Sequence, residues 1–304
     1  MRWSVVVPVL NGAHVLARTV PAVCSLVQPR PDAEAVYVDD GSTDGSAALI
    51  ARLAGAAVRV VRHSGNRGRA AARNTGAAAA RGEALVFLDA DVIPEAGLLR
   101  GLEPALEAGV AAVAALRPGE LDPSEPYHAY LAFGRRGPSH APPGPLPWRY
   151  FVTAAAAIRR SAFEAAGGFD EHVCYGEDLA LACAVARAHP AGLRYAPEAR
   201  ATLLDNGSLA VARDKAEAFG RNLPVIARRC PEVLAVAGLA RLEAPGTLSA
   251  AFRWVATRRV LAAALERMAY HGPAGLRLRA VRYLLAHALA TGYADAVSLP
   301  AQHG

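Results

Sequence analysis

Lysine is almost missing from this 304-residue sequence, in which Lys215 is the only lysine among 33 basic residues and the formal net charge is +6. Arginines therefore carry the positive charge, and they are spread along the chain instead of gathering beside aromatic residues, which make up only 6%. Proteins that bind nucleic acid usually cluster cations with aromatic side chains that stack on bases. The sequence therefore predicts no nucleic-acid partner and favours an anionic small molecule or surface.

Long hydrophobic runs are also absent. No window reaches the roughly eighteen uncharged apolar residues of a membrane-spanning helix, and the first residues lack the charged region and cleavage site of a secretory signal. The four cysteines have no spacing typical of metal ligands, and we expect buried, reduced thiols. We therefore expect a cytoplasmic globular protein, either soluble or peripheral at the inner face of the membrane.

The first 115 residues alternate between strand and helix patterns. Short β-branched apolar runs are typical of strands, and apolar residues that recur every three or four positions are typical of helices. The expected strands are 4–9, 35–39, 58–61, 85–88 and 110–115. The expected helices are 15–27, 46–53, 69–80 and 95–107. This order predicts an α/β, Rossmann-like fold with a mostly parallel central sheet and flanking helices on both faces.

The later part of the chain changes character. Residues 117–148 are rich in proline and glycine, which predicts a long loop that is either a functional lid or a surface insertion. Further expected elements are strands at 151–158, 193–196 and 201–204 and helices at 161–166 and 177–189. From residue 209 onward the pattern is helical, which predicts a helical C-terminal extension.

Carboxylates follow two of the expected parallel strands. Asp89-Ala90-Asp91 closes the apolar run 84–88, and Asp40 opens the turn Asp40-Gly41-Ser42-Thr43-Asp44 after another strand. Ligands of such sheets bind outside the carboxyl ends of the strands, so both acidic segments can converge on one crevice. Oxygen ligands suit Mg²⁺ and Mn²⁺. The alternative for 40–44 alone is an ordinary turn.

Two further segments offer charged groups at helix starts. Arg69 and Arg73 lie four apart after a glycine-containing loop, so they share one helical face and can point at a diphosphate. Glu177 and Asp178 begin another expected helix, where a carboxylate can accept a proton from an incoming hydroxyl. Considered alone, Arg69 and Arg73 could equally form an ordinary cationic helix face. Considered alone, Glu177 and Asp178 are more typical of a helix N-terminal cap.

Taken together, these segments resemble the family 2 glycosyltransferases with the GT-A fold, over about residues 1 to 210. The matching stretches are Val5-Val6-Val7-Pro8-Val9-Leu10-Asn11, Val38-Asp39-Asp40-Gly41-Ser42-Thr43-Asp44, Ala72-Arg73-Asn74-Thr75-Gly76, Phe87-Leu88-Asp89-Ala90-Asp91, Gly167-Gly168-Phe169-Asp170-Glu171 and Gly176-Glu177-Asp178-Leu179. The resemblance implies sugar transfer from a nucleotide diphosphate donor to an acceptor hydroxyl, with a divalent metal, Mn²⁺ or Mg²⁺, and with inversion.

The resemblance also implies roles for individual residues. The residues expected to bind the donor are Pro8, Val9 and Asn11 at the nucleoside, Asp40 at the base, Arg69 and Arg73 near the base or diphosphate, and Asp89 at the ribose or sugar. Asp91, with Asp89, is expected to hold the metal. Asp178 is expected to be the catalytic base, with Glu177 beside it.

Two positions depart from the family pattern. Ala180 stands where many relatives have a last acidic residue, while Asp178 is kept. The stretch Leu203-Leu204-Asp205-Asn206 lacks the histidine that often completes the metal site. Asp205 as an oxygen ligand, a water molecule, or a weakly held metal are the three alternatives for the missing contact.

The resemblance divides the chain into a catalytic domain and an extension. The expected domains are 1–210, with a nucleotide-binding half 1–115 and an acceptor-side half 116–210, and the helical extension 211–304. Arginines accompany apolar residues in the extension at helical spacing. Such helices pack on the catalytic domain, contact an anionic membrane or form a homo-oligomer, and all three stay open.

Two other functions compete with transfer. A nucleotidyltransferase that forms sugar nucleotides uses a similar sheet and acidic ligands, but it needs a glycine-rich, basic phosphate loop after the first strand. Here that loop reads Asn11-Gly12-Ala13-His14. A non-catalytic nucleotide-binding scaffold with the same fold is the second alternative. The acceptor, whether saccharide, lipid-linked or small molecule, is not specified by the sequence.

Overall fold

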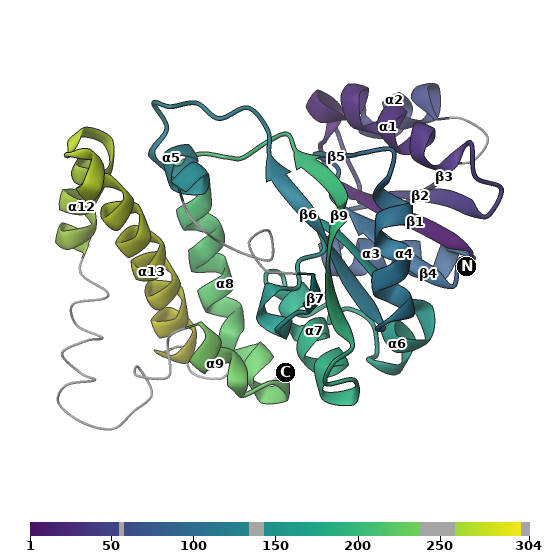
Figure 1. The fold of residues 1–304 in the computed structure, drawn as a ribbon. Helices are drawn as coiled ribbons and strands as arrows, with labels where there is room; N and C mark the ends of the chain where they lie inside the picture. Colours follow the sequence, from purple (N-terminus) through teal and green to yellow (C-terminus); the bar gives the residue numbers. More distant parts are fainter. Residues whose placement is uncertain (55–57, 134–142, 238–258, 299–304) are drawn as a thin grey trace. The chain divides into compact units, whose positions relative to one another are not determined.

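The computed structural model describes residues 1–54, 58–133, 143–237 and 259–298 (Figure 1). The chain forms two compact units. Unit 1 comprises Met1–Gly119, Arg135–Glu171 and Glu177–Asp205, and unit 2 comprises Glu120–Gly134, His172–Gly176 and Asn206–Gly304. The predicted domain boundary at residue 210 lies near the last of these divisions and stays a prediction.

Unit 1 begins with four parallel strands joined by helices. The strands are β1 (Trp3–Val9), β2 (Ala33–Asp39), β3 (Val58–Arg62) and β4 (Ala84–Leu88). The connecting helices are α1 (Ala13–Val27), α2 (Ser46–Leu53) and α3 (Arg69–Ala79). Strands β1, β2 and β4 are largely buried apolar runs, as expected for a parallel sheet covered on both faces.

The rest of the sheet is mixed in direction. Its strand order is β3-β2-β1-β4-β8-β6-β9-β5, with β7 paired to β9. The additional strands are β5 (Val92–Pro94), β6 (Ala111–Pro118), β7 (Gly144–Pro145), β8 (Ala155–Arg159) and β9 (Leu193–Leu203). Strand β8 runs antiparallel to both β4 and β6, while β6 and β9 are parallel. The α/β prediction is confirmed, with parallel pairing concentrated in the N-terminal half.

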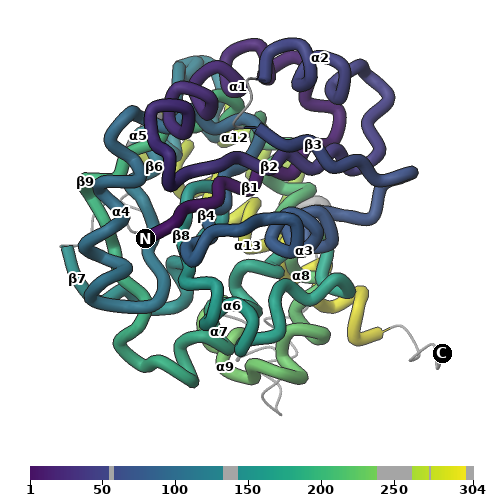
Figure 2. The backbone as a smooth tube through the Cα atoms, turned by 90° about the vertical axis from the view of Figure 1, so that its right-hand side faces the viewer, coloured from purple at the N-terminus to yellow at the C-terminus, as the bar shows by residue number. Residues whose placement is uncertain are grey.

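Helices cover both faces of this sheet. Along β1 and β4, successive side chains enter opposite clusters: Val5 and Val86 pack on one face, while Val6 and Phe87 pack on the other. The first cluster includes residues of α1, α2 and α4 (Leu98–Glu107), and the second includes residues of α3, α6 (Arg160–Ala165) and α7 (Glu177–Ala188). Figure 2 shows α1 and α2 on one side of the strands and α3 and α6 on the other.

Unit 2 is helical. Its helices are α5 (Pro126–Phe133), α8 (Leu209–Arg229), α9 (Glu232–Val236), α12 (Arg259–His271) and α13 (Ala274–Ser298). Glycines bring α8 and α13 close together, because a side-chain carbon at Gly220 would meet the carbonyl oxygen of Leu289, and one at Gly292 would meet that of Glu217. The predicted helical C-terminal extension is thus confirmed.

Several expected elements differ from those observed. The predicted loop at 117–148 contains α5, β7 and a short 3-10 helix that begins at Trp148 (Trp148–Tyr150), and its residues 134–142 lie outside the described part. The two strands expected at 193–196 and 201–204 form the single strand β9, whose register with β6 shifts between Ala114 and Ala115. Strand β5 was not predicted, because three residues carry too little periodicity.

The cysteines divide into two kinds. Cys24 is a buried free thiol, as predicted, and Cys174 is free but exposed. Cys183 and Cys230 are disulfide-bonded, so the prediction of reduced thiols is wrong for them. Among the described helices, none combines the length and apolar character needed to cross a bilayer.

Candidate active site

The predicted site residues lie at or just after the carboxyl ends of β1, β2, β4 and β9 and in the first turns of α3 and α7. At the end of β1, Asn11 has a φ of 51°, a left-handed conformation that asparagine tolerates better than most residues. Its Oδ1 accepts a hydrogen bond from the Thr43 N–H (2.9 Å), and its own N–H donates to Ser42 Oγ (2.9 Å). The loop after β1 is therefore fixed to the loop after β2.

Two neighbours of Asn11 were also expected to line the nucleoside pocket. Pro8 is half-buried, whereas Val9 is 2% exposed and packs in the core cluster on the α1 face. The carbonyl oxygen of Val9 accepts a hydrogen bond from the Asp40 N–H (2.8 Å). Val9 therefore positions Asp40 through its backbone, while its side chain faces the core.

Asp40 is buried and holds the loop that precedes α3. Its Oδ1 accepts from the Arg67 N–H and its Oδ2 from the Gly68 N–H, both at 2.9 Å. His63 Nδ1 lies 2.7 Å from Asp40 Oδ1, and His63 Nε2 lies 3.0 Å from Thr75 Oγ1. Sequence reasoning missed His63, which carries no motif signal and follows an expected strand as one polar residue among several.

The two arginines of α3 have different surroundings. Arg69 is exposed in the first turn. Arg73 is 2% exposed, and its Nη1 donates to Glu177 Oε1 (2.6 Å) while its Nη2 donates to Asp89 Oδ1 (2.7 Å). The guanidinium also lies over the Phe169 ring, 5.6 Å from its centre. One buried cation therefore joins the segment after β4 to the start of α7.

Asp89 and Asp91 are both half-buried at the end of β4. The Asp89 carbonyl accepts from the Val92 N–H (3.1 Å), which turns the chain into β5, and the Asp91 carbonyl accepts from the Leu204 N–H (2.8 Å). Asp205, the residue after Leu204, is exposed. The backbone thus brings the proposed third ligand to the neighbourhood of Asp91.

These three carboxylates suit a divalent cation in chemistry, since oxygen ligands are what Mg²⁺ and Mn²⁺ prefer. They do not form a compact set of ligands, because within the described part of the chain their oxygen atoms do not all lie within 4.8 Å of one another. One oxygen of Asp89, Oδ1, also accepts a hydrogen bond from Arg73. The arrangement fits an open site that is completed by water and by oxygens of a ligand, as Mg²⁺ sites commonly are.

Glu177 and Asp178 begin α7 but differ in role. Glu177 is 3% exposed and is paired with Arg73. Asp178 is half-buried and accepts a hydrogen bond from the Leu179 N–H at 2.8 Å. Burial raises the pKa of Asp178 to about 6, the neighbouring Glu177 carboxylate adds to the rise, and Arg73 opposes it. A carboxylate with a pKa near neutrality is matched to a general base.

Asn74 fixes the loop that precedes α7. Its Oδ1 accepts from the Phe169 N–H and its Nδ2 donates to the Phe169 carbonyl, both at 2.9 Å, and Nδ2 also donates to Glu171 Oε1 (3.0 Å). Phe169 packs against Phe87 and Phe163, with ring centres 5.0 and 5.4 Å away. Asn74 was quoted in a motif without a role, and the structure supplies one, which is to position this loop.

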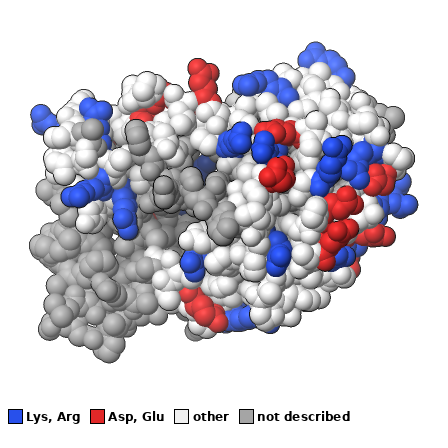
Figure 3. Space-filling model, in the orientation of Figure 1, with Lys and Arg blue, Asp and Glu red and all other residues white. Residues whose placement is uncertain are grey.

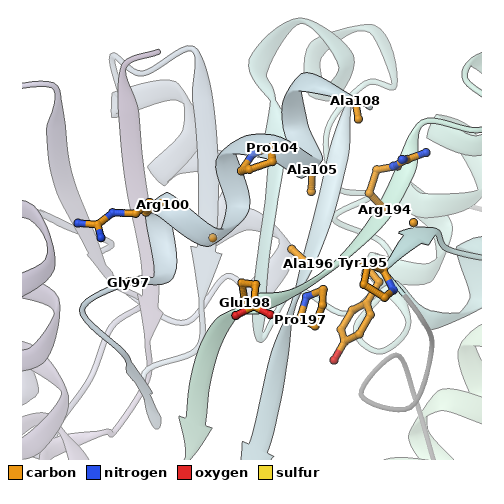
Figure 4. A pocket seen from close by; sticks show the side chains of 13 residues that line it. Gly97, Arg100, Pro104, Ala105, Ala108, Arg194, Tyr195, Ala196, Pro197 and Glu198 are labelled. Atoms are coloured by element: carbon orange, nitrogen blue, oxygen red, sulfur yellow. The ribbon is translucent and has the colours of Figure 1, made fainter.

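A cavity of about 590 Å³ lies elsewhere in unit 1, between α4 and β9. Figure 4 shows Pro104 and Ala105 of α4 facing Ala196 and Pro197 of β9 across it. None of the predicted site residues is among the residues that line it. The candidate site is therefore identified by its charged groups and by the raised pKa of Asp178, and not by this cavity.

This chain is similar in sequence to known glycosyltransferases. The family model described as Glycosyl transferase family 2 matches residues 4–167. The pre-mycofactocin glycosyltransferase of Mycobacterium tuberculosis (strain ATCC 25618 / H37Rv) is 34% identical over 201 residues, which are 64% of this chain and 41% of that protein. This chain therefore spans less than half the length of that relative.

Solved structures share the fold at lower identity. The mannosyltransferase PcManGT from Pyrobaculum calidifontis, in complex with GDP-Man and Mn²⁺, superposes with a TM-score of 0.61 at 23% identity, covering 95% of this chain and 86% of that one. S. aureus TarS 1–349 in complex with UDP-GlcNAc also has a TM-score of 0.61, at 15% identity, covering 98% and 92%. The unit-1 sheet and its helices thus have the GT-A architecture that the sequence predicted.

Proposed function

This chain belongs to glycosyl transferase family 2, and from that premise we propose that it transfers a sugar from a nucleotide diphosphate donor to an acceptor hydroxyl, with inversion and with a divalent metal. The observation that carries the proposal is the Arg73 bridge. A single buried guanidinium binds Asp89 and Glu177, which lie in two different motifs. Asp178 follows Glu177 in the chain. The bridge therefore fixes Asp89, proposed for the donor, relative to Asp178, proposed for the acceptor.

The metal is proposed to bind Asp91, with Asp89 and Asp205 as further oxygen ligands. A bound Mn²⁺ or Mg²⁺ would neutralise charge that develops on the departing diphosphate. The fold relative from Pyrobaculum calidifontis was solved with GDP-Man and Mn²⁺, which supports this choice of ligand and ion. Arg69, which is exposed at the start of α3, is the cation proposed to meet the diphosphate. Arg73 is buried and is proposed to contribute indirectly, by positioning the Asp89 carboxylate.

The nucleoside is proposed to lie against the loops after β1 and β2. Three acceptor positions of the Asp40 carboxylate are used by His63 and by two backbone N–H groups. A carboxylate offers about four such positions, so one is left for a base N–H. Asn11 and Pro8 would border the same pocket. His63 is proposed as the residue that fixes the orientation of Asp40.

Asp178 is proposed as the general base. The acceptor O–H proton passes to its carboxylate, the oxygen forms a bond to the anomeric carbon, and the bond from that carbon to the diphosphate oxygen breaks. Attack from the face opposite the leaving group inverts the configuration. Because the pKa of Asp178 is about 6, the carboxylate is ionised at neutral pH and is still basic enough to share the proton.

A thermal-shift panel of nucleoside diphosphates and sugar nucleotides, with and without Mn²⁺, tests the donor site. A ligand that binds the folded state raises the midpoint in proportion to the logarithm of its concentration over its dissociation constant. We expect one sugar nucleotide to stabilise the protein only with metal, and Asp91→Asn to lose that shift. The matched control is Asp214→Asn, an exposed aspartate on α8. No shift with any nucleotide would favour a scaffold without donor binding.

The location of the protein stays a prediction. We propose a cytoplasmic enzyme, soluble or peripheral at the inner face of the membrane, although a disulfide such as that at Cys183 and Cys230 is more common outside the cytosol. Fractionation of cells that express the full-length protein would check it. Recovery from the soluble or inner-membrane fraction is expected, and recovery from the secreted fraction would contradict the proposal.

A further inference from the structure

The hairpin of α12 and α13 in unit 2 has an outer surface that the site does not use. We call residues 259–298 the basic hairpin. Its helices pack on each other around buried Ala269, Val281 and Leu284. The turn between them is tied down, because Arg277 Nε donates to the Gly272 carbonyl (2.7 Å). The hairpin is therefore an ordered element whose outer face is fixed.

That outer face is rich in arginine. Arg267, Arg279 and Arg282 are exposed, and residues 267–294 contain no aspartate or glutamate. Within the part of the chain that the structure describes, neither Arg279 nor Arg282 has an ion-pair partner. Figure 3 shows basic side chains over α12 and α13, at the left of the view. The nearest acidic residues in the chain are Glu266 and Asp295, so residues 267–294 have a net positive charge.

Large apolar side chains are interleaved with these arginines. Tyr283 is 64% exposed and Leu276 is 42% exposed. Leu276, Arg279 and Tyr283 follow one another at spacings of three and four, so they form one stripe of α13. The opposite side of the helix, with Val281 and Leu284, is fully buried. Both faces of α13 are thus apolar in part, and within the described residues only the face with Val281 and Leu284 is buried by other side chains.

We propose that the basic hairpin docks on the surface of an anionic lipid bilayer. Arginines would meet the acidic headgroups, and Leu276 and Tyr283 would enter the boundary between headgroups and acyl chains, where tyrosine is favoured. A nucleic acid would use the arginines but would gain nothing from exposed Leu276 or Met268. The mixture of charge and aliphatic surface therefore favours lipid.

Vesicle co-sedimentation of the full chain tests the docking surface. Vesicles of phosphatidylcholine alone are compared with vesicles containing about one third phosphatidylglycerol. Membrane attraction is roughly 1 kcal/mol per basic residue near the surface, which is about fivefold in affinity. We therefore expect Arg279→Glu/Arg282→Glu to weaken binding to anionic vesicles by at least tenfold. Leu276→Ser/Tyr283→Ser should weaken it at unchanged charge.

Arg18→Glu/Arg52→Glu is the matched control, since both arginines are exposed on α1 and α2 and the change in net charge is identical. It should leave vesicle binding within about twofold. Equal binding to neutral vesicles, an equal loss in the control, or no loss in either hairpin variant would overturn the proposal. So would binding of a 20-base-pair DNA duplex that survives Leu276→Ser/Tyr283→Ser unchanged and exceeds vesicle binding.

Membrane docking does not depend on the transfer chemistry, so the two can fail separately. Donor hydrolysis in solution should be the same in both hairpin variants as in the unaltered protein. Circular dichroism of each variant confirms that the helices are intact. Loss of vesicle binding with full donor turnover is the result that supports docking by the hairpin.

Discussion

Arg73 is the residue on which the candidate site depends most. It is buried, and its two Nη atoms bind carboxylates that lie 16 and 104 positions away in the sequence. A buried charge is stable only when it is paired, and removal of one partner costs more than the pair contributes. The Arg73 bridge therefore determines both where Asp89 lies and how α7 begins.

Replacing Arg73 should destabilise the fold measurably. Arg73→Met leaves Glu177 buried without its cation, and we expect a loss of about 3–5 kcal/mol in the free energy of unfolding. Arg73→Met/Glu177→Gln should recover part of that loss, because the buried Glu177 charge is then removed and only the half-buried Asp89 is left without its cation. Urea denaturation gives both values. Arg69→Met, on the same helix but exposed, should cost less than about 0.5 kcal/mol, and an equal cost would contradict the bridge.

Asp178 makes a prediction about the pH dependence of turnover. As general base it must be ionised, and its pKa is about 6. The value of kcat/KM should therefore rise with pH through about 6 and then level off. Asp178→Asn should lower kcat by at least about a hundredfold, within the range of general-base effects. An acid limb that persists unchanged in the residual activity of the variant would assign it to another group.

Asp178 should also affect stability, because the ionised form that activity requires makes the folded state less stable. Because the pKa of Asp178 is higher in the folded state than the 3.8 of an ordinary aspartate, its ionisation opposes folding, and stability falls as pH rises from about 4 to 6. Asp178→Asn should raise the melting temperature at pH 8, and the gain should shrink toward pH 4. Calorimetry at both pH values checks this. A lower melting temperature at pH 8 would contradict it.

At the scale of elements, sequence patterns predicted what is local and periodic. The helix 46–53 matches α2, and the strands of the N-terminal half match β1 to β4 within one or two residues. Strand β5 and helix α5 were missed, because the first is three residues long and the second lies in a segment rich in turn formers. The antiparallel insertion of β8 between β4 and β6 is set by tertiary pairing, which no local pattern encodes.

The site shows the same limit. Motifs placed Asp89 and Asp178 correctly at a strand end and a helix start. They did not reveal that Arg73 turns inward or that His63 contacts Asp40. These contacts join residues far apart in the chain, so their geometry follows from the fold and not from spacing. Arg69 and Arg73 share a helix, yet burial separates their roles.

The crossing of α8 and α13 gives a prediction at this scale. Gly220→Ala would place a methyl group against the carbonyl of Leu289, and we expect a loss of about 1–3 kcal/mol despite better helix propensity. Gly275→Ala, in the same unit with nothing within 4 Å, should be neutral or stabilising by up to about 1 kcal/mol. Thermal unfolding compares them. Equal effects would mean that the two helices do not pack closely.

At the scale of the whole molecule, the chain combines a GT-A sheet unit with a helical unit. The first holds every residue proposed for donor, metal and proton transfer, and the second holds the proposed membrane surface. The family model covers residues 4–167, so it stops before Asp178. The proposal of Asp178 as base is supported instead by its raised pKa and by the motif around Glu177.

The most direct measurement is release of nucleoside diphosphate from the sugar nucleotide selected by the thermal-shift panel. We predict turnover with Mn²⁺ or Mg²⁺ that falls by at least about a hundredfold on chelation, in Asp91→Asn and in Asp178→Asn. Asp214→Asn should keep full turnover. Unchanged turnover in both Asp91→Asn and Asp178→Asn, or release of pyrophosphate from a nucleoside triphosphate and a sugar phosphate, would contradict the account.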